Sequence, residues 1–270
     1  MVSPLDGKVA IVTGGGRGLG RAMVLGLANA GVRVIATAAR ESGEVEAVAR
    51  EASGGVVPML ADVTKETDAA ALVTEAIRRF GRLDILVNNA GRGMKYVSET
   101  FLTEPTRFWE TDPETWRLLI DTNVTGPFLL ARAAAPVMMR AGWGRIVNTS
   151  ASYSTMGRRG FSPYGPSKAA LESETLIWAK DLDGSGVTVN AILPGGATLT
   201  GMIPDSYSPA DRARLLDPAV IVPPLLYLAS AESAGITGKR FDASRWRTDL
   251  PPAEAASLCA HDAGVYDAPG

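Results

Sequence analysis

The sequence predicts one α/β domain, a doubly wound parallel sheet flanked by helices. Short apolar runs rich in β-branched residues alternate with helical patterns along the chain, which is typical of parallel βαβ units. A glycine-rich turn at residues 13–20 separates the first apolar run from the first helical pattern, the context of a dinucleotide-binding turn. With 270 residues, 46% of them hydrophobic, the chain can bury a substantial core.

The apolar runs predict strands at 8–13, 32–38, 56–61, 84–88, 144–149, 187–192 and 238–242. The patterns between them predict helices near 18–30, 66–80, 113–140, 163–182 and 219–231. No repeat or low-complexity linker interrupts this alternation, so residues 1–245 are expected to form a single dinucleotide-binding and catalytic domain. The extension at 246–270 contains Trp246, Leu250 and several prolines. We expect it to pack on the same domain or on a neighbouring subunit.

Composition argues against several classes of partner. A net charge of −2 and a pI near 5.6 give no electrostatic footprint for nucleic acid or for an anionic membrane. One cysteine, Cys259, and one histidine, His261, leave no internal disulfide and no cysteine–histidine zinc cluster. No apolar run approaches the roughly 18 residues of a membrane span, and the start does not resemble a signal peptide. We therefore expect a cytoplasmic protein without a metal.

Two segments that follow apolar strands have the chemistry of a nucleotide site. The first, Thr13 to Gly20, places glycines where the backbone must approach a pyrophosphate, at the start of a helix whose N-terminus attracts negative charge. The second runs from Asp84 to Gly91 and ends in two amides, an alanine and a glycine. Either segment alone is equally consistent with an ordinary tight turn.

Tyr164 and Lys168 lie four residues apart at the start of a predicted helix, on one face and one turn apart. A fixed cation close to a phenol stabilises the phenolate and lowers the tyrosine pKa toward working pH, which makes the phenol a usable proton donor. An exposed helical face is the alternative interpretation of this pair on its own.

These motifs, together with Asn123 and Pro194-Gly195, resemble in order and spacing the classical short-chain dehydrogenases/reductases over roughly residues 6 to 243. The resemblance implies a Rossmann-type fold, a nicotinamide cofactor and hydride transfer at a carbonyl or alcohol carbon. It also implies a homodimer or homotetramer, with the long helices at 113–140 and 163–182 packing across a twofold axis. The catalytic residues that it implies are Asn123, Ser152, Tyr164 and Lys168. The cofactor-binding residues that it implies are Gly14, Gly16, Arg17, Gly18, Leu19, Gly20, Arg40, Asp62, Val63, Asn89, Ala90, Gly91, Tyr164, Lys168, Pro194, Gly195, Ala197 and Thr198.

Several of these roles have a second interpretation. In the family the asparagine at this position holds a water through its backbone carbonyl, but Asn123 can also be a polar residue that bonds within its own helix. Asp62 is expected to contact the adenine, and it can equally cap the helix that follows. Thr198 and Thr200 are both candidates for bracing the nicotinamide carboxamide. Residues 199–212 are expected to form a mobile lid over the substrate.

The end of the second strand favours NADP over NAD. The acidic residue that would accept hydrogen bonds from the adenine ribose of NAD is missing, because the strand continues into Ala38, Ala39 and Arg40. Arg40 and Arg17 can pair a 2′-phosphate, or they are ordinary surface arginines. Glu41 weighs against the phosphate, so NAD stays possible.

The catalytic serine is the point of departure from the family pattern. Counting without gaps, its position falls on Ala151, with Ser150 and Ser152 on either side. We favour Ser152 as the substrate-facing hydroxyl. If Ala151 truly occupies the site, the substrate oxygen loses one hydrogen-bond donor, which costs about 10²-fold or more in rate.

The preferred function is NADPH-dependent reduction of a largely apolar ketone, a small-molecule carbonyl or alcohol substrate. Candidate wall residues are Tyr96, Phe101, Phe108, Trp109, Tyr153, Met156 and Met202. The alternative for the aromatic residues is that they anchor the inserted loop onto its own domain. Arg158 and Arg159 can meet a carboxylate or phosphate, or be solvated loop charges. The alternatives are an NAD-dependent sugar or polyol dehydrogenase and a non-catalytic NADP-binding redox sensor, which Ala151 would favour.

Overall fold

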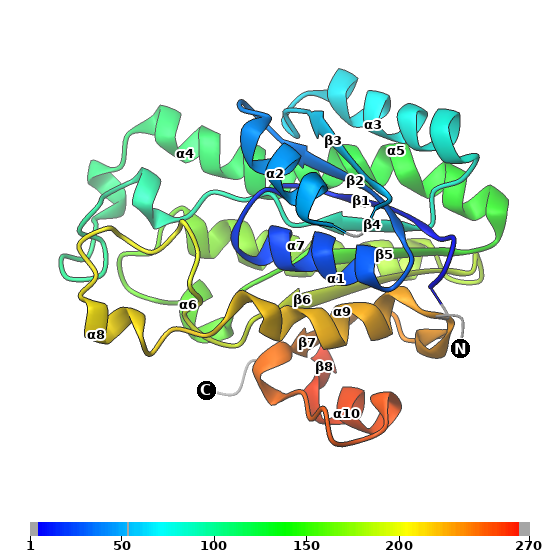
Figure 1. The fold of residues 1–270 in the computed structure, drawn as a ribbon. Coiled ribbons are helices and arrows are strands. Elements are labelled where there is room, and N and C mark those ends of the chain that lie inside the picture. The colour runs from blue at the N-terminus through cyan, green and yellow to red at the C-terminus, as the bar shows by residue number, and fades with distance from the viewer. Residues whose placement is uncertain (1–4, 53, 265–270) are drawn as a thin grey trace.

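The computed structural model describes residues 5–52 and 54–264, and these form a three-layer α/β domain (Figure 1). One eight-stranded sheet has the order β3-β2-β1-β4-β5-β6-β7-β8. All neighbouring strands are parallel except β7 and β8, which are antiparallel. The strand order reverses direction between β1 and β4, so the predicted doubly wound Rossmann-type sheet is confirmed.

The seven predicted strands are present, and an eighth follows them. Their bounds are β1 Val9–Val12, β2 Arg33–Ala38, β3 Val56–Leu60, β4 Ile85–Asn88, β5 Gly144–Thr149, β6 Val187–Leu193, β7 Lys239–Asp242 and β8 Ala260–Asp262. Strands β1, β4, β5 and β6 are buried along their whole length. This burial is the reason why they appear in the sequence as continuous apolar runs rather than as alternating patterns.

The helices are α1 Gly18–Asn29, α2 Gly43–Glu51, α3 Glu66–Phe80, α4 Pro113–Ile120, α5 Gly126–Ala141, α6 Tyr153–Met156, α7 Tyr164–Asp181, α8 Pro209–Arg212, α9 Val222–Ala229 and α10 Pro252–Cys259. Helix α2 is absent from the sequence prediction. Its signals are a pair of buried valines three residues apart, Val45 and Val48, and acidic residues in its first turn.

The predicted helix at 113–140 is wrong as a single helix. Between α4 and α5 the chain forms one π-helical turn, η3 (Asp121–Thr125). Such a turn inserts one residue into the ladder of hydrogen bonds, and the buried Asn123 lies inside it. Pro127 stands at the start of α5, where a missing backbone N–H costs little.

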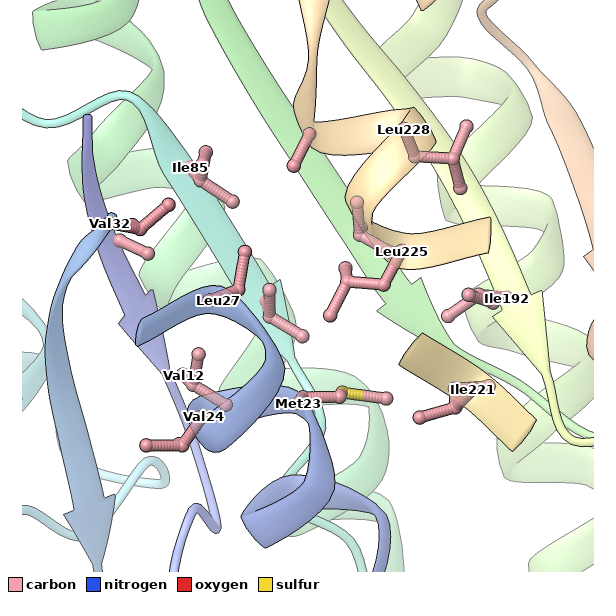
Figure 2. Close-up of a cluster of buried hydrophobic side chains, with 14 of the residues drawn as sticks. Val12, Met23, Val24, Leu27, Val32, Ile85, Ile192, Ile221, Leu225 and Leu228 are labelled. Atoms are coloured by element: carbon pink, nitrogen blue, oxygen red, sulfur yellow. The ribbon is translucent and has the colours of Figure 1, made fainter. Parts of the chain in front are cut away.

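Two apolar layers hold the helices to the sheet. On one face α1 and α9 pack over the central strands, and Figure 2 shows their side chains meeting there, with Leu27 from α1 and Leu225 from α9. On the other face α3, α5 and α7 pack through residues such as Leu72, Leu130 and Ala179. The rigid sheet between these layers positions the loops at its carboxyl edge.

The C-terminal segment packs on the same domain. Trp246 lies against Tyr227 of α9, with ring centroids 5.8 Å apart. Helix α10 buries Ala256 and Cys259 in the α1–α9 layer, and burial raises the pKa of the Cys259 thiol to about 11. Strand β8 then pairs with β7 and becomes an edge of the sheet, and Figure 1 shows it in red beside β7. Residues 265–270, including Tyr266, lie outside the described part of the chain.

Candidate active site

The predicted motifs meet at one edge of the sheet. Strands β1, β4, β5 and β6 are parallel neighbours, so the segments that follow Val12, Asn88, Thr149 and Leu193 all begin at the same edge. The strand order reverses between β1 and β4, where α/β folds characteristically form ligand crevices. The structure therefore brings the glycine turn, the Asn-Asn-Ala-Gly segment, the serine loop and the Pro-Gly turn to one place.

The glycine turn has the backbone that its sequence predicts. Gly14 has φ +63°, a left-handed angle that favours glycine. A Cβ on Gly20 would lie 1.9 Å from the carbonyl oxygen of Gly14, so helix α1 can approach the turn only without a side chain there. In the described structure no side chain caps the start of α1, and its first turn holds no acidic residue. This uncapped N-terminus fits the pyrophosphate of a dinucleotide.

Thr13 and Asn89 join the glycine turn to the end of β4. The Thr13 hydroxyl oxygen accepts hydrogen bonds from the backbone amides of Asn89 and Ala90, both at 3.0 Å. In return, Asn89 Nδ2 donates to the carbonyl oxygens of Thr13 at 2.9 Å and Gly14 at 3.1 Å. The sequence indicated Asn89 as a cofactor contact, whereas in the structure its side chain shapes the turn. Thr13 was not among the predicted site residues, although its place between β1 and the first glycine was a signal.

The two arginines of the cofactor prediction differ in their surroundings. Arg17 lies at the start of α1, and its Nη1 is 3.6 Å from a carboxylate oxygen of Glu44 on α2. Both of these side chains are largely exposed. Arg40 is exposed in the turn after β2, and the described structure gives it no ion-pair partner.

Asp62 follows β3 and turns the chain toward α3. Its Oδ1 accepts hydrogen bonds from the backbone amide of Thr64 at 3.1 Å and from the hydroxyl of Thr64 at 2.8 Å. Partial burial opposes ionisation, but these two hydrogen bonds prevail and lower the pKa of the carboxyl. Asp62 therefore forms a local turn and does not cap α3, which begins at Glu66 without a side-chain cap from the described residues.

Tyr164 opens helix α7, and Lys168 lies one turn further along it, as predicted. Lys168 Nζ lies 5.9 Å from the centroid of the Tyr164 ring and donates a hydrogen bond to the carbonyl oxygen of Thr149 at 2.7 Å. Burial lowers the pKa of Lys168 to about 8, against the opposing charge of Glu172. Burial also raises the pKa of Tyr164 to about 12. This direction is opposite to the expected lowering of the tyrosine pKa, and its cause is burial of the phenol.

Asn123 is fully buried, and both polar atoms of its side chain form hydrogen bonds. Its Oδ1 accepts from the backbone amide of Arg92 at 2.8 Å, and its Nδ2 donates to the Arg92 carbonyl at 2.9 Å and to the Ser167 hydroxyl at 2.9 Å. These bonds link the loop after β4 to α7. The alternative of a polar residue bonding within its own helix does not describe this side chain.

The serine loop offers two different hydroxyls. Ser150 is buried, and its Oγ has no hydrogen-bond partner among the described residues. Ser152 is partly exposed and begins α6, where its Oγ accepts from the Thr155 amide at 3.2 Å and contacts the Thr155 hydroxyl at 2.8 Å. Between them Ala151 is buried, and its carbonyl oxygen accepts a hydrogen bond from Arg240 at 2.7 Å. Arg240, which makes this contact, is not among the site residues that the sequence predicted.

The Pro-Gly turn after β6 leads back over the glycine turn. Gly195 has φ +90°. Thr198 is buried and donates to the Gly196 carbonyl at 3.0 Å. Thr200 is the closer of the two threonines to the glycine turn, since a Cβ on Gly18 would lie 3.1 Å from the Thr200 Cβ. Lys95 Nζ, 3.1 Å from Asp205, ties the following segment to the loop after β4.

A cavity of about 610 Å³ lies between the loop at 103–109 and the loop that precedes α7. Phe108 and Trp109 line it with their rings in edge-to-face contact, although they are 70% and 63% exposed. Phe161 lines it too and packs in the same small cluster as Tyr164. Three guanidinium groups also line the cavity, those of Arg107, Arg158 and Arg159, together with one carboxylate, that of Glu104. None of the three arginines forms an ion pair with the described residues, but Arg107 lies over the Trp109 ring and Arg158 over the Phe161 ring.

The part of the chain that the structure describes lacks two further features. It contains no helix long and apolar enough to cross a membrane. It also contains no group of three or more histidine, cysteine, aspartate or glutamate side chains arranged to hold a metal ion.

Comparison with known proteins gives a consistent picture. A family model for short chain dehydrogenases matches residues 8–210. The 3-oxoacyl-(acyl-carrier-protein) reductase FabG of Vibrio cholerae is 35% identical over 242 residues, 87% of this chain and 95% of that protein. The L-fucose dehydrogenase of Bos taurus is 38% identical over 191 residues, 70% of this chain and 66% of that protein. The crystal structure of the 3-ketoacyl-(acyl-carrier-protein) reductase of Brucella melitensis complexed with NADH has a TM-score of 0.77 at 30% identity, over 88% of this chain and 97% of that chain.

Proposed function

This chain belongs to the short-chain dehydrogenases, and from that premise we propose that it reduces a carbonyl compound with NADPH. The observation that carries the proposal is the meeting of Tyr164 and Lys168 with an uncapped glycine turn at one edge of the sheet. Tyr164 supplies a proton donor and Lys168 a cation, and the glycine turn fits the pyrophosphate of a dinucleotide.

In the proposed reaction the bound nicotinamide supplies a hydride to the carbonyl carbon. Tyr164 gives the substrate oxygen its proton, because its phenol carries an O–H group one helical turn from the Lys168 ammonium. Lys168, with Nζ held by the Thr149 carbonyl, stabilises negative charge on the phenolate that remains. Ser152 supplies a hydrogen bond to the substrate oxygen, and Asn123 fixes the loop after β4 beside α7.

The preference for NADPH rests on Arg17 and Arg40, which can pair the 2′-phosphate of the adenosine. The reductases to which this chain is similar include one crystallised with NADH. Glu44 is close to Arg17 and competes for its guanidinium, so it weakens this preference.

The cavity between 103–109 and 156–162 supports a bulky substrate with both apolar and anionic parts. Its aromatic lining favours an apolar body, and its three guanidinium groups, which outnumber the single carboxylate of Glu104, favour a carboxylate or phosphate substituent. Similarity to two 3-oxoacyl-(acyl-carrier-protein) reductases supports a 3-oxo compound. Oxidation of a sugar is the second candidate, because similarity to an L-fucose dehydrogenase favours it.

We further propose a homodimer or homotetramer in the cytoplasm. Three helices leave large apolar side chains exposed: Trp116 of α4 is 39% exposed, Phe128 and Met139 of α5 are 44% and 48% exposed, and Ile177 of α7 is 51% exposed. Packing these helices against a second copy would remove that surface from water.

The test measures consumption of NADPH and of NADH with paired 3-oxo acids and their esters, and reduction of NAD and NADP with L-fucose. Turnover with NADPH, faster for the acids, is the expected result. Equal rates for acids and esters would contradict the anionic substituent, and turnover only with L-fucose would replace reduction by sugar oxidation. Binding of NADPH without turnover in any reaction would favour a redox sensor.

A further inference from the structure

An ion pair is buried directly beneath the serine loop. Arg240 of β7 and Glu172 of α7 are 5% and 0% exposed, and the Arg240 Nε lies 3.2 Å from Glu172 Oε1. Burying two charges costs desolvation energy that their attraction often fails to repay. The ion pair is therefore expected to add little to the stability of the fold, and its other contacts indicate its role.

Arg240 contacts the serine loop at two residues, Ala151 and Tyr153, which flank Ser152. Its Nη2 donates a hydrogen bond to the Ala151 carbonyl oxygen at 2.7 Å. Its guanidinium carbon lies 3.8 Å from the centroid of the Tyr153 ring. Ser152 lies between these two contacts, so its backbone is held on both sides by one side chain.

The C-terminal segment completes the arrangement. The amide of Gly264 donates to Glu172 Oε2 at 3.3 Å. The Tyr153 hydroxyl donates to the carbonyl oxygens of Gly264 at 2.5 Å and Asp262 at 3.3 Å. Asp262 of strand β8 and Gly264 therefore contact the same ion pair and the Tyr153 ring that packs on it.

We propose that Arg240, oriented by Glu172, which the Gly264 amide contacts in turn, is a positioning residue that fixes the backbone of residues 151–153 and so places the Ser152 hydroxyl. The inference rests on the proposed function. Its physical basis is that a guanidinium with several donors in a rigid plane can hold a carboxylate, a carbonyl and an aromatic ring at once. A misplacement of about 1 Å in a catalytic group costs on the order of 10²-fold in rate.

The decisive variant replaces both charges, Arg240→Met with Glu172→Met. Removing one partner alone would strand a buried charge, whereas removing both leaves an apolar pair that folded proteins tolerate. Lys239→Met is the matched control, because Lys239 is the adjacent residue of β7 and pairs with exposed Asp262 of β8. Arg240→Lys keeps the charge opposite Glu172 but lacks the planar fork.

We expect the double variant to lower kcat by on the order of 10-fold or more, while the Kd for NADPH stays within about twofold. Arg240→Lys should give an intermediate kcat, and Lys239→Met a wild-type kcat. Hydrogen exchange in a peptide covering 150–157 should be faster in the double variant than in Lys239→Met. An unchanged kcat, or unchanged exchange in that peptide, would overturn the inference.

The two readouts separate this inference from the proposed function. If the wild-type protein turns over none of the substrates, the proposed function fails, and hydrogen exchange still decides whether Arg240 fixes the loop. If the double variant does not fold, as judged by circular dichroism, Arg240→Lys carries the test. A wild-type kcat and wild-type exchange in Arg240→Lys would then overturn the role of the planar fork.

Discussion

Asn89 donates from the end of β4 to the Gly14 carbonyl oxygen at 3.1 Å, so a side chain on one strand sets the shape of the glycine turn on its neighbour. The same amide nitrogen also bonds the Thr13 carbonyl. The glycine turn that follows β1 is thus held by a residue that follows β4, the neighbouring strand across the point where the strand order reverses.

Replacing Asn89 by alanine should weaken dinucleotide binding and lower stability by about 1–2 kcal/mol, because two backbone carbonyls lose their partner. Asn190→Ala is the control, since Asn190 of β6 also bonds two backbone groups, those of Ile236 and Lys239. Both variants should lose a similar free energy of unfolding. Equal weakening of NADPH binding in both, measured by fluorescence titration, would contradict a special role for Asn89.

Replacing Tyr164 by phenylalanine should lower kcat by roughly 10²–10⁴-fold, because the ring and its packing stay while the proton donor is lost. The Kd for NADPH and the Tm should change little. Tyr227→Phe on α9, which keeps the ring against Trp246, serves as the control. Substantial turnover by Tyr164→Phe, followed by absorbance of the reduced cofactor, would remove the phenol from the mechanism.

Three variants decide which hydroxyl faces the substrate. Ser152→Ala should lower kcat by about 10²-fold, the typical effect of one lost oxyanion donor. Ser150→Ala should have little effect on rate, since the Ser150 hydroxyl is buried and unpartnered among the described residues. If Ser150→Ala is the slower variant, or if Ala151→Ser raises kcat, the assignment to Ser152 is wrong.

Arg40→Ala should weaken NADPH binding by about tenfold or more and leave NADH binding nearly unchanged, because only NADPH carries the 2′-phosphate. Glu44→Gln should have the opposite effect by freeing Arg17. Arg78→Ala, at an exposed position of α3, controls for net charge. Parallel calorimetric titrations with both cofactors make the comparison, and an equal loss for NADH and NADPH would reject the arginine argument.

Glu174 provides a pH-dependent stability effect. Burial raises the pKa of this carboxyl to about 7 from an ordinary 4.5, and its Oε2 has no hydrogen-bond partner among the described residues. A carboxyl whose pKa rises on folding destabilises the fold where it must ionise, fully above about pH 7 and not at all below about pH 4.5. Glu174→Gln should therefore raise Tm by several degrees at pH 8 and hardly at pH 4.5, in a thermal scan. A pH-independent change in Tm would contradict this account.

Much of the fold was predictable because buried parallel strands produce continuous apolar runs, as in Val9–Val12 and Val187–Leu193. Helix α2 escaped prediction because its apolar face is narrow, with only Val45 and Val48 buried. The π-helical turn at Asn123 escaped because it adds one residue to a pattern that otherwise reads as continuous helix.

The site residues also divide into those that the sequence could predict and those that it could not. Tyr164, Lys168 and the glycines were predictable because their spacing is local. Arg240 was not, since its partners Ala151 and Glu172 are 89 and 68 residues away and only the sheet brings them together. The raised pKa of Tyr164 was also out of reach, because it depends on the packing around the ring rather than on the neighbouring cation.

Strand β8, only three residues long, covers the edge that β7 would otherwise expose. Unpaired strand edges invite another chain to extend the sheet, and proteins protect them with short, charged or proline-bearing strands. Here β8 covers β7 and ends in His261 and Asp262, while β3 at the opposite edge carries Pro58 opposite Ala36. Both margins resist strand addition, so this protein should withstand sheet-to-sheet aggregation, and any second copy must dock through helices.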